Sequence, residues 1–282
     1  MFDVRVFARA ALIGLVCLVV MAGRAYAQSL DLSRYHVVNS FGAPRAESSA
    51  ITYDWDSDTL FIVEDSARFI SQITKTGGLV SEMTLTGFGD TEGLSYVGDG
   101  KFVIADERVQ TLSLIGYSAG GSVKKSEVPS YSLGPRVGNV GIEGVSFDPS
   151  SGGYLAVKQQ DPAKVYEVTI SFGKPTTGKQ VELFDPALLG LKSLSDVQVL
   201  SMPWFTGRGF ERNLLILSAQ SGKLLEVDRA GKVLSSFDLS KLSATAEGVT
   251  IDKDGNIYIA TEGRGPDVIM VLAPPPAPLR PE

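Results

Sequence analysis

A short phrase of apolar and polar positions returns five times along the chain. Its third, apolar position falls at 51, 94, 145, 197 and 249, so the copies are 43, 51, 52 and 52 residues apart. Each copy is followed by a turn and then by a continuous apolar run, as at 60–63 and 257–260. Such runs are typical of strands buried on both faces. Repeats of roughly 40–50 residues made of short strands predict the blades of a β-propeller.

The same pattern predicts five blades and a ring closed from the N-terminal side. Two further amphipathic strands complete most repeats, for example 69–75 and 79–85. The last repeat ends near Leu272 and runs into three prolines, which cannot supply a paired strand. Residues 35–41 precede the first repeat and are expected to close the last blade. We therefore expect an all-β, five-bladed propeller; six blades would need a repeat that the sequence lacks. Helical periodicity is almost absent, apart from one possible turn within 186–194.

The first 27 residues have the pattern of a secretory signal peptide. Arg5 and Arg9 precede an apolar run at 10–23, and Ala25-Tyr26-Ala27 fits the small-x-small cleavage pattern. The run is shorter than the roughly 20 residues that span a bilayer. We expect cleavage at Ala27, a periplasmic or secreted protein, and no transmembrane domain after cleavage. Retention at the envelope membrane by an uncleaved segment is the alternative.

The expected organisation is then a signal peptide (1–27), a short linker (28–33), the propeller (34–272) and a proline-rich C-terminal tail (273–282). We expect a monomer whose ligand, a small molecule or an envelope protein, is unknown.

Composition narrows the chemistry that this fold can carry. The 282 residues include one Cys and one His, and the formal net charge is −6. Cys17 lies in the expected signal peptide, and His36 lies on the expected closing strand. Zinc sites of Cys and His and a Ser-His-Asp triad are therefore disfavoured. The negative charge argues against binding to nucleic acid.

Two rings of polar residues are expected at one mouth of the central channel. The phrase begins the innermost strand of each blade, and the next strand returns antiparallel. The start of the first strand and the end of the second therefore share one face. The phrase ring comprises Glu92, Glu143, Asp196 and Glu247. The second ring comprises Asp65, Glu107 and Glu262, with Gln159 and Gln220.

Carboxylates gathered in a narrow channel repel one another unless a cation, bound protons or water compensates them. Hard oxygen ligands without His or Cys favour Ca²⁺. We therefore expect a calcium site on these acids; the alternative is that they cap main-chain N–H groups. Arg108, Lys158 and Arg264 flank the second ring, where they pair with the acids or bind an anionic ligand.

Two segments outside the rings, residues 54–58 and 204–212, also have distinctive sequences. Residues 54–58 resemble the start of an EF-hand loop, but Thr59 stands where that loop requires Gly, so we interpret them as a hairpin turn at the opposite face. An insertion at 204–212 is either a partner-binding loop or a surface hairpin. Trp55 and Trp204 are interpreted as packing residues.

The phrases "GIEGVSFDP", "LLILSAQSGKLLEVDRAGKV" and "AEGVTIDKDGNIYIATE" resemble the SdiA-regulated (YjiK-like) propeller family. The resemblance covers about 47–272. It implies an exported or envelope-associated β-propeller, related by fold to phytase-like propellers, with Ca²⁺ as a ligand. The positions matching the family are Glu92, Glu107, Glu143, Asp196, Glu247 and Glu262. Gln159 and Gln220 stand where the family tends to carry Glu, which lowers the local negative charge.

Two classes of function follow. The first is a calcium-binding, non-catalytic module in the periplasm. The second is a metal-dependent hydrolase of phosphoesters or lactones. A phosphoesterase needs a metal-held water and several cations on the phosphate, and Arg108, Lys158 and Arg264 are the only inward candidates. A histidine-assisted lactonase is disfavoured by the single His36. The binding module is therefore favoured.

Overall fold

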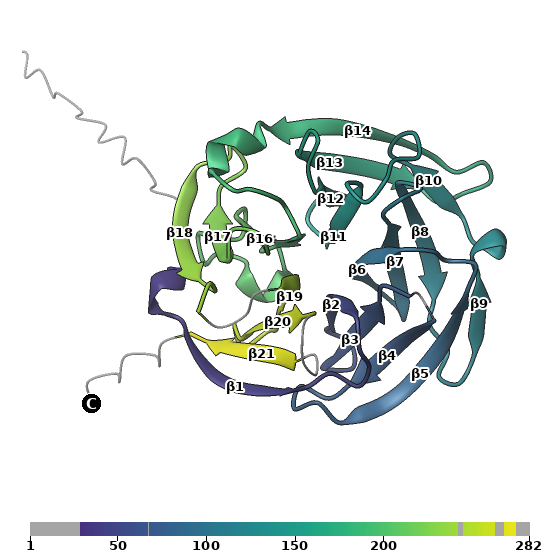
Figure 1. The fold of residues 1–282 in the computed structure, drawn as a ribbon, viewed down its shortest axis with the longest axis horizontal. Coiled ribbons are helices and arrows are strands. Elements are labelled where there is room, and N and C mark those ends of the chain that lie inside the picture. Colours follow the sequence, from purple (N-terminus) through teal and green to yellow (C-terminus); the bar gives the residue numbers. More distant parts are fainter. Residues whose placement is uncertain (1–28, 67, 242–244, 263–267, 275–282) are drawn as a thin grey trace, which may run out of the picture.

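The computed structural model describes residues 29–66, 68–241, 245–262 and 268–274. Five sheets are arranged radially around a central axis (Figure 1), and we call the space between their innermost strands the central channel. The protein is therefore the all-β, five-bladed propeller that the repeats predict. The short helical turn expected within 186–194 is the 3-10 helix η3 (Pro186–Leu189).

Each blade runs from an innermost strand beside the channel to an outermost strand at the rim. In that order, blade 1 contains β2 (Ser48–Asp54), β3 (Thr59–Glu64), β4 (Phe69–Ile73), β5 (Leu79–Thr86) and β9 (Ser122–Lys124). Blade 2 contains β6 (Thr91–Gly98), β7 (Lys101–Asp106), β8 (Thr111–Gly116) and β10 (Ser130–Ser132). Blades 3 and 4 contain β11 (Ile142–Asp148), β12 (Gly153–Lys158), β13 (Lys164–Ser171) and β14 (Thr177–Phe184), and β15 (Asp196–Val199), β16 (Leu214–Ser218), β17 (Lys223–Val227) and β18 (Val233–Asp238). Blade 5 contains β19 (Ala246–Ile251), β20 (Ile257–Thr261), β21 (Val268–Ala273) and β1 (His36–Gly42).

The outermost strand of blade 5 comes from the N-terminal side of the chain. β1 pairs antiparallel with β21, from His36 opposite Ala273 to Gly42 opposite Val268. In Figure 1 the purple β1 lies beside the yellow β21. The expected closure is confirmed, and His36 is exposed on this closing strand.

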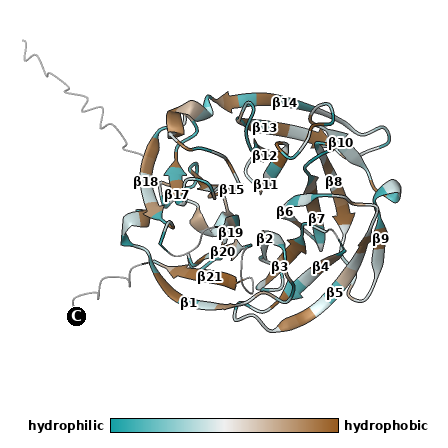
Figure 2. Cartoon of the chain, viewed as in Figure 1, coloured by the Kyte–Doolittle hydropathy of each residue, from teal (hydrophilic) through white to brown (hydrophobic). Residues whose placement is uncertain are grey.

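The second strand of each blade is buried, as its continuous apolar run predicts. In β16, for example, Leu214, Leu215, Ile216 and Leu217 are all fully buried. Brown, hydrophobic stretches run along the strands in Figure 2, whereas many connecting loops are hydrophilic. Hydrophobic side chains thus fill the space between adjacent blades and stabilise the ring.

A closed ring of side-chain hydrogen bonds joins the five innermost strands. At the fourth position of the repeated phrase, a hydroxyl in one blade accepts a hydrogen bond from a main-chain N–H of the next. The donor and acceptor pairs are Tyr96–Thr52 (3.1 Å), Phe147–Ser95 (2.8 Å), Val199–Ser146 (3.0 Å) and Tyr53–Thr250 (3.0 Å). Blade 4 completes the ring because the Thr250 hydroxyl donates to the Gln198 side-chain oxygen at 3.0 Å.

Residues 29–34, most of the expected linker, pack against blade 4. Leu32, in the 3-10 helix η1 (Leu32–Arg34), is fully buried. The buried carboxylate of Glu226 accepts hydrogen bonds from the Leu30 N–H at 2.8 Å and from the Ser29 hydroxyl. The segment therefore spans from blade 4 to the closing strand of blade 5.

Candidate functional site

The acids of the repeated phrase sit on β-bulges at the start of the innermost strands. Register shifts leave Glu92, Glu143 and Glu247 as the extra residues of β6, β11 and β19. A bulge interrupts the alternation of a strand and re-aims one side chain. In blade 1 the corresponding residue is Ser49, so that blade offers a hydroxyl in place of an acid.

The glycine after each of these acids allows neighbouring innermost strands to approach closely. A Cβ on Gly144 would lie 2.5 Å from Oδ1 and 2.6 Å from Cα of Asp196 in the next blade. A Cβ on Gly93 would lie 2.7 Å from the Glu143 carbonyl oxygen. In the Glu-Gly pair, the acid faces the channel mouth and the glycine makes room for the adjacent blade.

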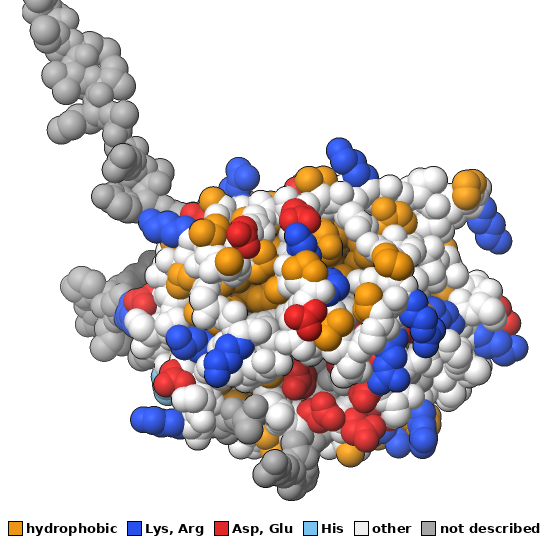
Figure 3. All heavy atoms as spheres, turned by 45° about the horizontal axis from the view of Figure 1, so that its top comes forward, with side chains coloured by type: hydrophobic (Ala, Val, Ile, Leu, Met, Phe, Trp, Pro, Cys, Tyr) orange, Lys and Arg blue, Asp and Glu red, His pale blue; other side chains and the backbone are white. Residues whose placement is uncertain are grey.

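Five acids from blades 1 to 3 meet at this mouth, and we call them the acid cluster: Asp65, Asp90, Glu92, Glu107 and Glu143. Carboxylate oxygens of Asp65, Asp90 and Glu92 lie within 4.8 Å of one another. Asp90, Glu107 and Glu143 are buried. On the surface seen in Figure 3, exposed acidic side chains gather near Lys and Arg side chains; the three buried acids of the cluster are not part of this exposed set.

Glu107 is the most buried member of the acid cluster, with 1% of its surface exposed. Its Oε1 accepts a hydrogen bond from the Gly141 N–H at 2.9 Å. Its Oε2 is buried and receives no hydrogen bond from the described residues. The side chain lies against the carboxyl groups of Asp90 and Glu143. Such contacts are favourable only where a proton or a cation lies between the oxygens.

Burial and mutual repulsion raise the pKa values at this mouth. Burial, followed by the charges of Asp65 and Asp90, raises the pKa of Glu92 to about 9. Burial also raises the pKa of Glu143 well above its usual range. In blade 5, burial and then the charge of Glu262 raise the pKa of Glu247 to about 7. Without a cation, the mouth therefore retains protons at neutral pH.

Asp196 differs from the other acids of the phrase ring. Its Oδ1 accepts a hydrogen bond from the Val197 N–H and its Oδ2 from the Val249 N–H, both at 2.7 Å. The fully buried carboxylate thus links blade 4 to blade 5 and has both oxygens engaged. This geometry matches the capping alternative. Glu107 matches it in part, because its Oε1 accepts a main-chain N–H while its Oε2 has no donor among the described residues.

The predicted flanking residues have different surroundings. Arg108 pairs with Asp90, with 2.6 Å between Nε and Oδ2. Lys158 donates to the carbonyl oxygens of Gln160 and Pro162, and burial lowers its pKa. Gln220 is exposed and Gln159 half-buried. Arg264 lies outside the described residues.

Asp90 is a member of the acid cluster that sequence reasoning missed. It precedes Glu92 by two residues and lies outside the repeated phrase. The corresponding positions in blades 3 to 5 are Gly141, Ser193 and Thr245, and in blade 1 the position is Glu47. An acid therefore stands there in two of the five repeats, which is a weak signal that the repeated phrase does not include.

The family model for SdiA-regulated proteins matches residues 28–271. The chain belongs to the SdiA-regulated family. Solved propellers resemble it only at low identity. Virginiamycin B lyase from Staphylococcus aureus is 14% identical (TM-score 0.44, 83% of this chain and 68% of that one). A luciferin-regenerating enzyme is 10% identical (0.49, 85% and 94%), and the WD40 propeller of Doa1 is 12% identical (0.49, 86% and 98%). These likenesses are too weak to inform function.

In this SdiA-regulated propeller an aromatic bridge crosses the opposite mouth of the channel. Trp204 comes from η4 (Pro203–Phe205), in the connection that follows the innermost strand of blade 4. It contacts Tyr53 and Trp55 of blade 1 at ring-centroid distances of 5.9 and 6.1 Å. Trp55 in turn packs against Tyr96 of blade 2 at 4.5 Å. Because blades 4 and 1 are not neighbours in the ring, the bridge passes over the channel. The insertion therefore packs across this mouth, and both tryptophans are packing residues as expected.

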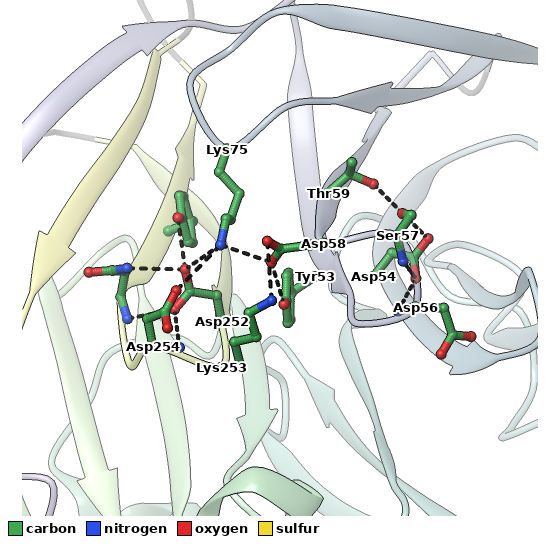
Figure 4. A network of polar contacts seen from close by, with 12 residues as sticks. Tyr53, Asp54, Asp56, Ser57, Asp58, Thr59, Lys75, Asp252, Lys253 and Asp254 are labelled. Atoms are coloured by element: carbon green, nitrogen blue, oxygen red, sulfur yellow. Dashed lines mark hydrogen bonds and ion pairs between the residues drawn. The ribbon is translucent and has the colours of Figure 1, made fainter.

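The opposite face also holds an ionic network between blades 5 and 1 (Figure 4). Lys75 Nζ lies 2.8 Å from Asp58 Oδ1 and 3.5 Å from Asp252 Oδ2. Asp58 belongs to the turn between β2 and β3, which confirms that 54–58 is a hairpin turn. In the described part of the chain, no helix has the length and apolar character needed to cross a membrane.

Proposed function

We propose that this SdiA-regulated propeller is a non-catalytic binding module that holds Ca²⁺ on its acid cluster. The observation that carries the proposal is the Glu107 Oε2 atom, which is buried against two other carboxyl groups without a donor. A cation there would replace the protons that the cluster otherwise needs.

The donor set favours calcium over softer metals. Asp65, Asp90 and Glu92 bring their oxygens close enough to share one ion, and Glu107 and Glu143 would lie behind them. All of these donors are carboxylate oxygens, which suit Ca²⁺ with its six to eight oxygen ligands. Water or an oxygen-bearing ligand would complete the coordination, which leaves room for a binding partner.

We also propose that the protein works in the periplasm or outside the cell after cleavage at Ala27. The packing of Ser29 and Leu30 on Glu226 supports this, because the folded body then begins directly after the cleavage site.

Calcium titration of the protein comprising residues 28–282 tests the calcium site. Saturation at about 100 times the Kd stabilises a folded protein by about 2.7 kcal/mol, which raises Tm by about 5–10 °C in a domain of this size. Glu92→Gln and Glu143→Gln should reduce the shift strongly. Glu182→Gln, on the exposed outer strand of blade 3, is the matched control.

The absence of any shift at millimolar Ca²⁺ would contradict the calcium proposal. A screen with phosphoester and lactone substrates, with and without Ca²⁺, tests the non-catalytic part. Calcium-dependent turnover would replace the binding module with the metal-dependent hydrolase.

A further inference from the structure

A second feature lies beside the acid cluster, between blades 1 and 2. A cavity of about 360 Å³ is lined by the cations Arg108, Lys125 and Arg136 and by the acids Asp90 and Asp106. It shares Asp90 and Arg108 with the calcium site proposed above. Its volume lies within the range of small-molecule pockets.

Lys125 reaches this cavity through an unusual connection. The segment between β8 and β10 leaves blade 2 and adds β9 (Ser122–Lys124) to blade 1, parallel to β5. The 3-10 helix η2 (Lys125–Glu127) follows directly. Lys125 Nζ then donates to Asp106 and, at 3.1 Å, to the Thr111 hydroxyl. Its ammonium group is thus fixed at the cavity wall.

Arg136 is held in place by the loop between β10 and β11. That loop is fastened to the β7–β8 turn on either side of Arg136. The Gln110 side chain donates to the Pro135 carbonyl, and the Val137 N–H donates to the Arg108 carbonyl at 3.0 Å. The Arg108 guanidinium also donates to Asn139 at 3.1 Å. The backbone position of Arg136 is therefore fixed before any ligand binds.

The charges of the cavity do not balance. Arg108 pairs with Asp90, and Lys125 pairs with Asp106. Across the described ranges, Arg136 is exposed and has no ion-pair or hydrogen-bond partner. One guanidinium thus remains for an external anion, with two further cations on the same wall.

We propose that this cavity binds the tetrahedral oxyanion of a small ligand, such as a phosphomonoester, through Arg136 and Lys125. Cations that approach from three separate loops can contact three oxygens of a tetrahedral group, which point in different directions. A planar carboxylate has only two oxygens, and a single arginine fork can bind both. The inference deepens the proposed function, because a calcium ion on Asp90 would lie beside the bound oxyanion. The two cations that would hold the oxyanion, Arg136 and Lys125, are not members of the acid cluster.

Calorimetric titration with phenyl phosphate tests the inference, with benzoate as a planar anion carrying the same ring. We expect phenyl phosphate to bind more tightly than benzoate. Arg136→Gln should weaken phenyl phosphate binding by about tenfold or more, as expected for a lost hydrogen bond to a charged group. Lys125→Gln should weaken it as well. Lys124→Gln is the matched control, because Lys124 is adjacent in sequence but exposed and paired with Glu127.

Equal losses in Arg136→Gln and Lys124→Gln would show general electrostatic attraction and overturn the inference. Equal affinity for benzoate would overturn the choice of a tetrahedral group. A calcium-dependent Tm shift without phenyl phosphate binding would overturn this inference alone. Phenyl phosphate binding without a calcium shift would overturn the calcium site and leave the oxyanion cavity standing.

Discussion

The Thr250 hydroxyl of blade 5 accepts a hydrogen bond from the Tyr53 N–H of blade 1 at 3.0 Å. Both residues are buried, and the contact joins the last repeat of the chain to the first. It is one link in the hydrogen-bonded ring around the channel, so its loss affects the contact between those two blades.

Thr250→Val keeps the shape of the side chain but removes the hydroxyl. The buried Tyr53 N–H then lacks its acceptor, which should lower the free energy of unfolding by about 1–3 kcal/mol. Thr250→Ser retains the hydroxyl and should lose much less. Urea denaturation of both variants checks the prediction, and equal losses would assign the effect to packing instead.

Gly144→Ala should destabilise the protein because the new Cβ would meet the Asp196 backbone at 2.6 Å. Backbone atoms of a neighbouring blade cannot move aside as a flexible side chain can. We expect a loss of about 1–3 kcal/mol, as for other overpacked sites. Gly138→Ala has no heavy atom within 4 Å of its Cβ and serves as the control. Comparable Tm values for the two variants would refute the close-approach argument.

Glu226 is expected to hold the N-terminal segment on blade 4. Besides Ser29 and Leu30, its carboxylate accepts from Asn213 at 2.8 Å and Ser235 at 2.7 Å. Glu226→Leu removes the shared acceptor of these four groups and should cost about 3 kcal/mol, whereas Glu226→Gln keeps one oxygen and should cost less. Amide hydrogen exchange should quicken first at residues 30–35. Uniformly faster exchange across all blades would contradict a local role.

The stability of the cation-free protein should fall as the pH rises from about 4.5 to 9. In this window the folded chain keeps protons on Glu92, whose pKa is raised from 4.5 to about 9, whereas the unfolded chain releases them. Each retained proton lowers the free energy of unfolding by about 1.4 kcal/mol per pH unit. Glu247 adds to the slope between its ordinary value and about 7.

Glu92→Gln should flatten this pH dependence, and calcium at saturating concentration should weaken it, because the cation replaces the protons. Chemical denaturation across the pH range in a chelating buffer, and then in calcium, measures both effects. Stability that increases steadily toward pH 9 without calcium would contradict the raised pKa values.

The fold was predictable because its signals are local and repeated. The phrase at 51, 94, 145, 197 and 249 and the apolar runs that follow it determine the number of blades. The proline run after Leu272 indicated that another strand must close the ring. Ser and Thr at the fourth position of four phrases would have indicated the hydroxyl ring, and the Glu-Gly pairs would have indicated bulges.

The site was predictable only where it follows the repeat. Glu92 and Glu143 of the phrase ring and Glu107 of the second ring come from positions that the repeat defines, whereas Asp90 lies outside the phrase and has an acidic counterpart, Glu47, in blade 1 alone. Lys125 reaches the mouth through a parallel pairing between β5 and β9, which no local pattern records. The contact between Trp204 and Tyr53 likewise depends on an insertion that crosses the ring.

The closure of blade 5 also determines how the protein responds to mechanical force. The N-terminal end of β1 pairs with the C-terminal end of β21, with His36 opposite Ala273. A force that separates the two chain ends therefore acts at one end of this strand pair, once the contacts of residues 29–34 have been released. The β1–β21 hydrogen bonds then break one after another instead of sharing the load in shear. We therefore expect the propeller to stay folded when it is attached to a surface by one end, and to open at low force when tension is applied between its two ends.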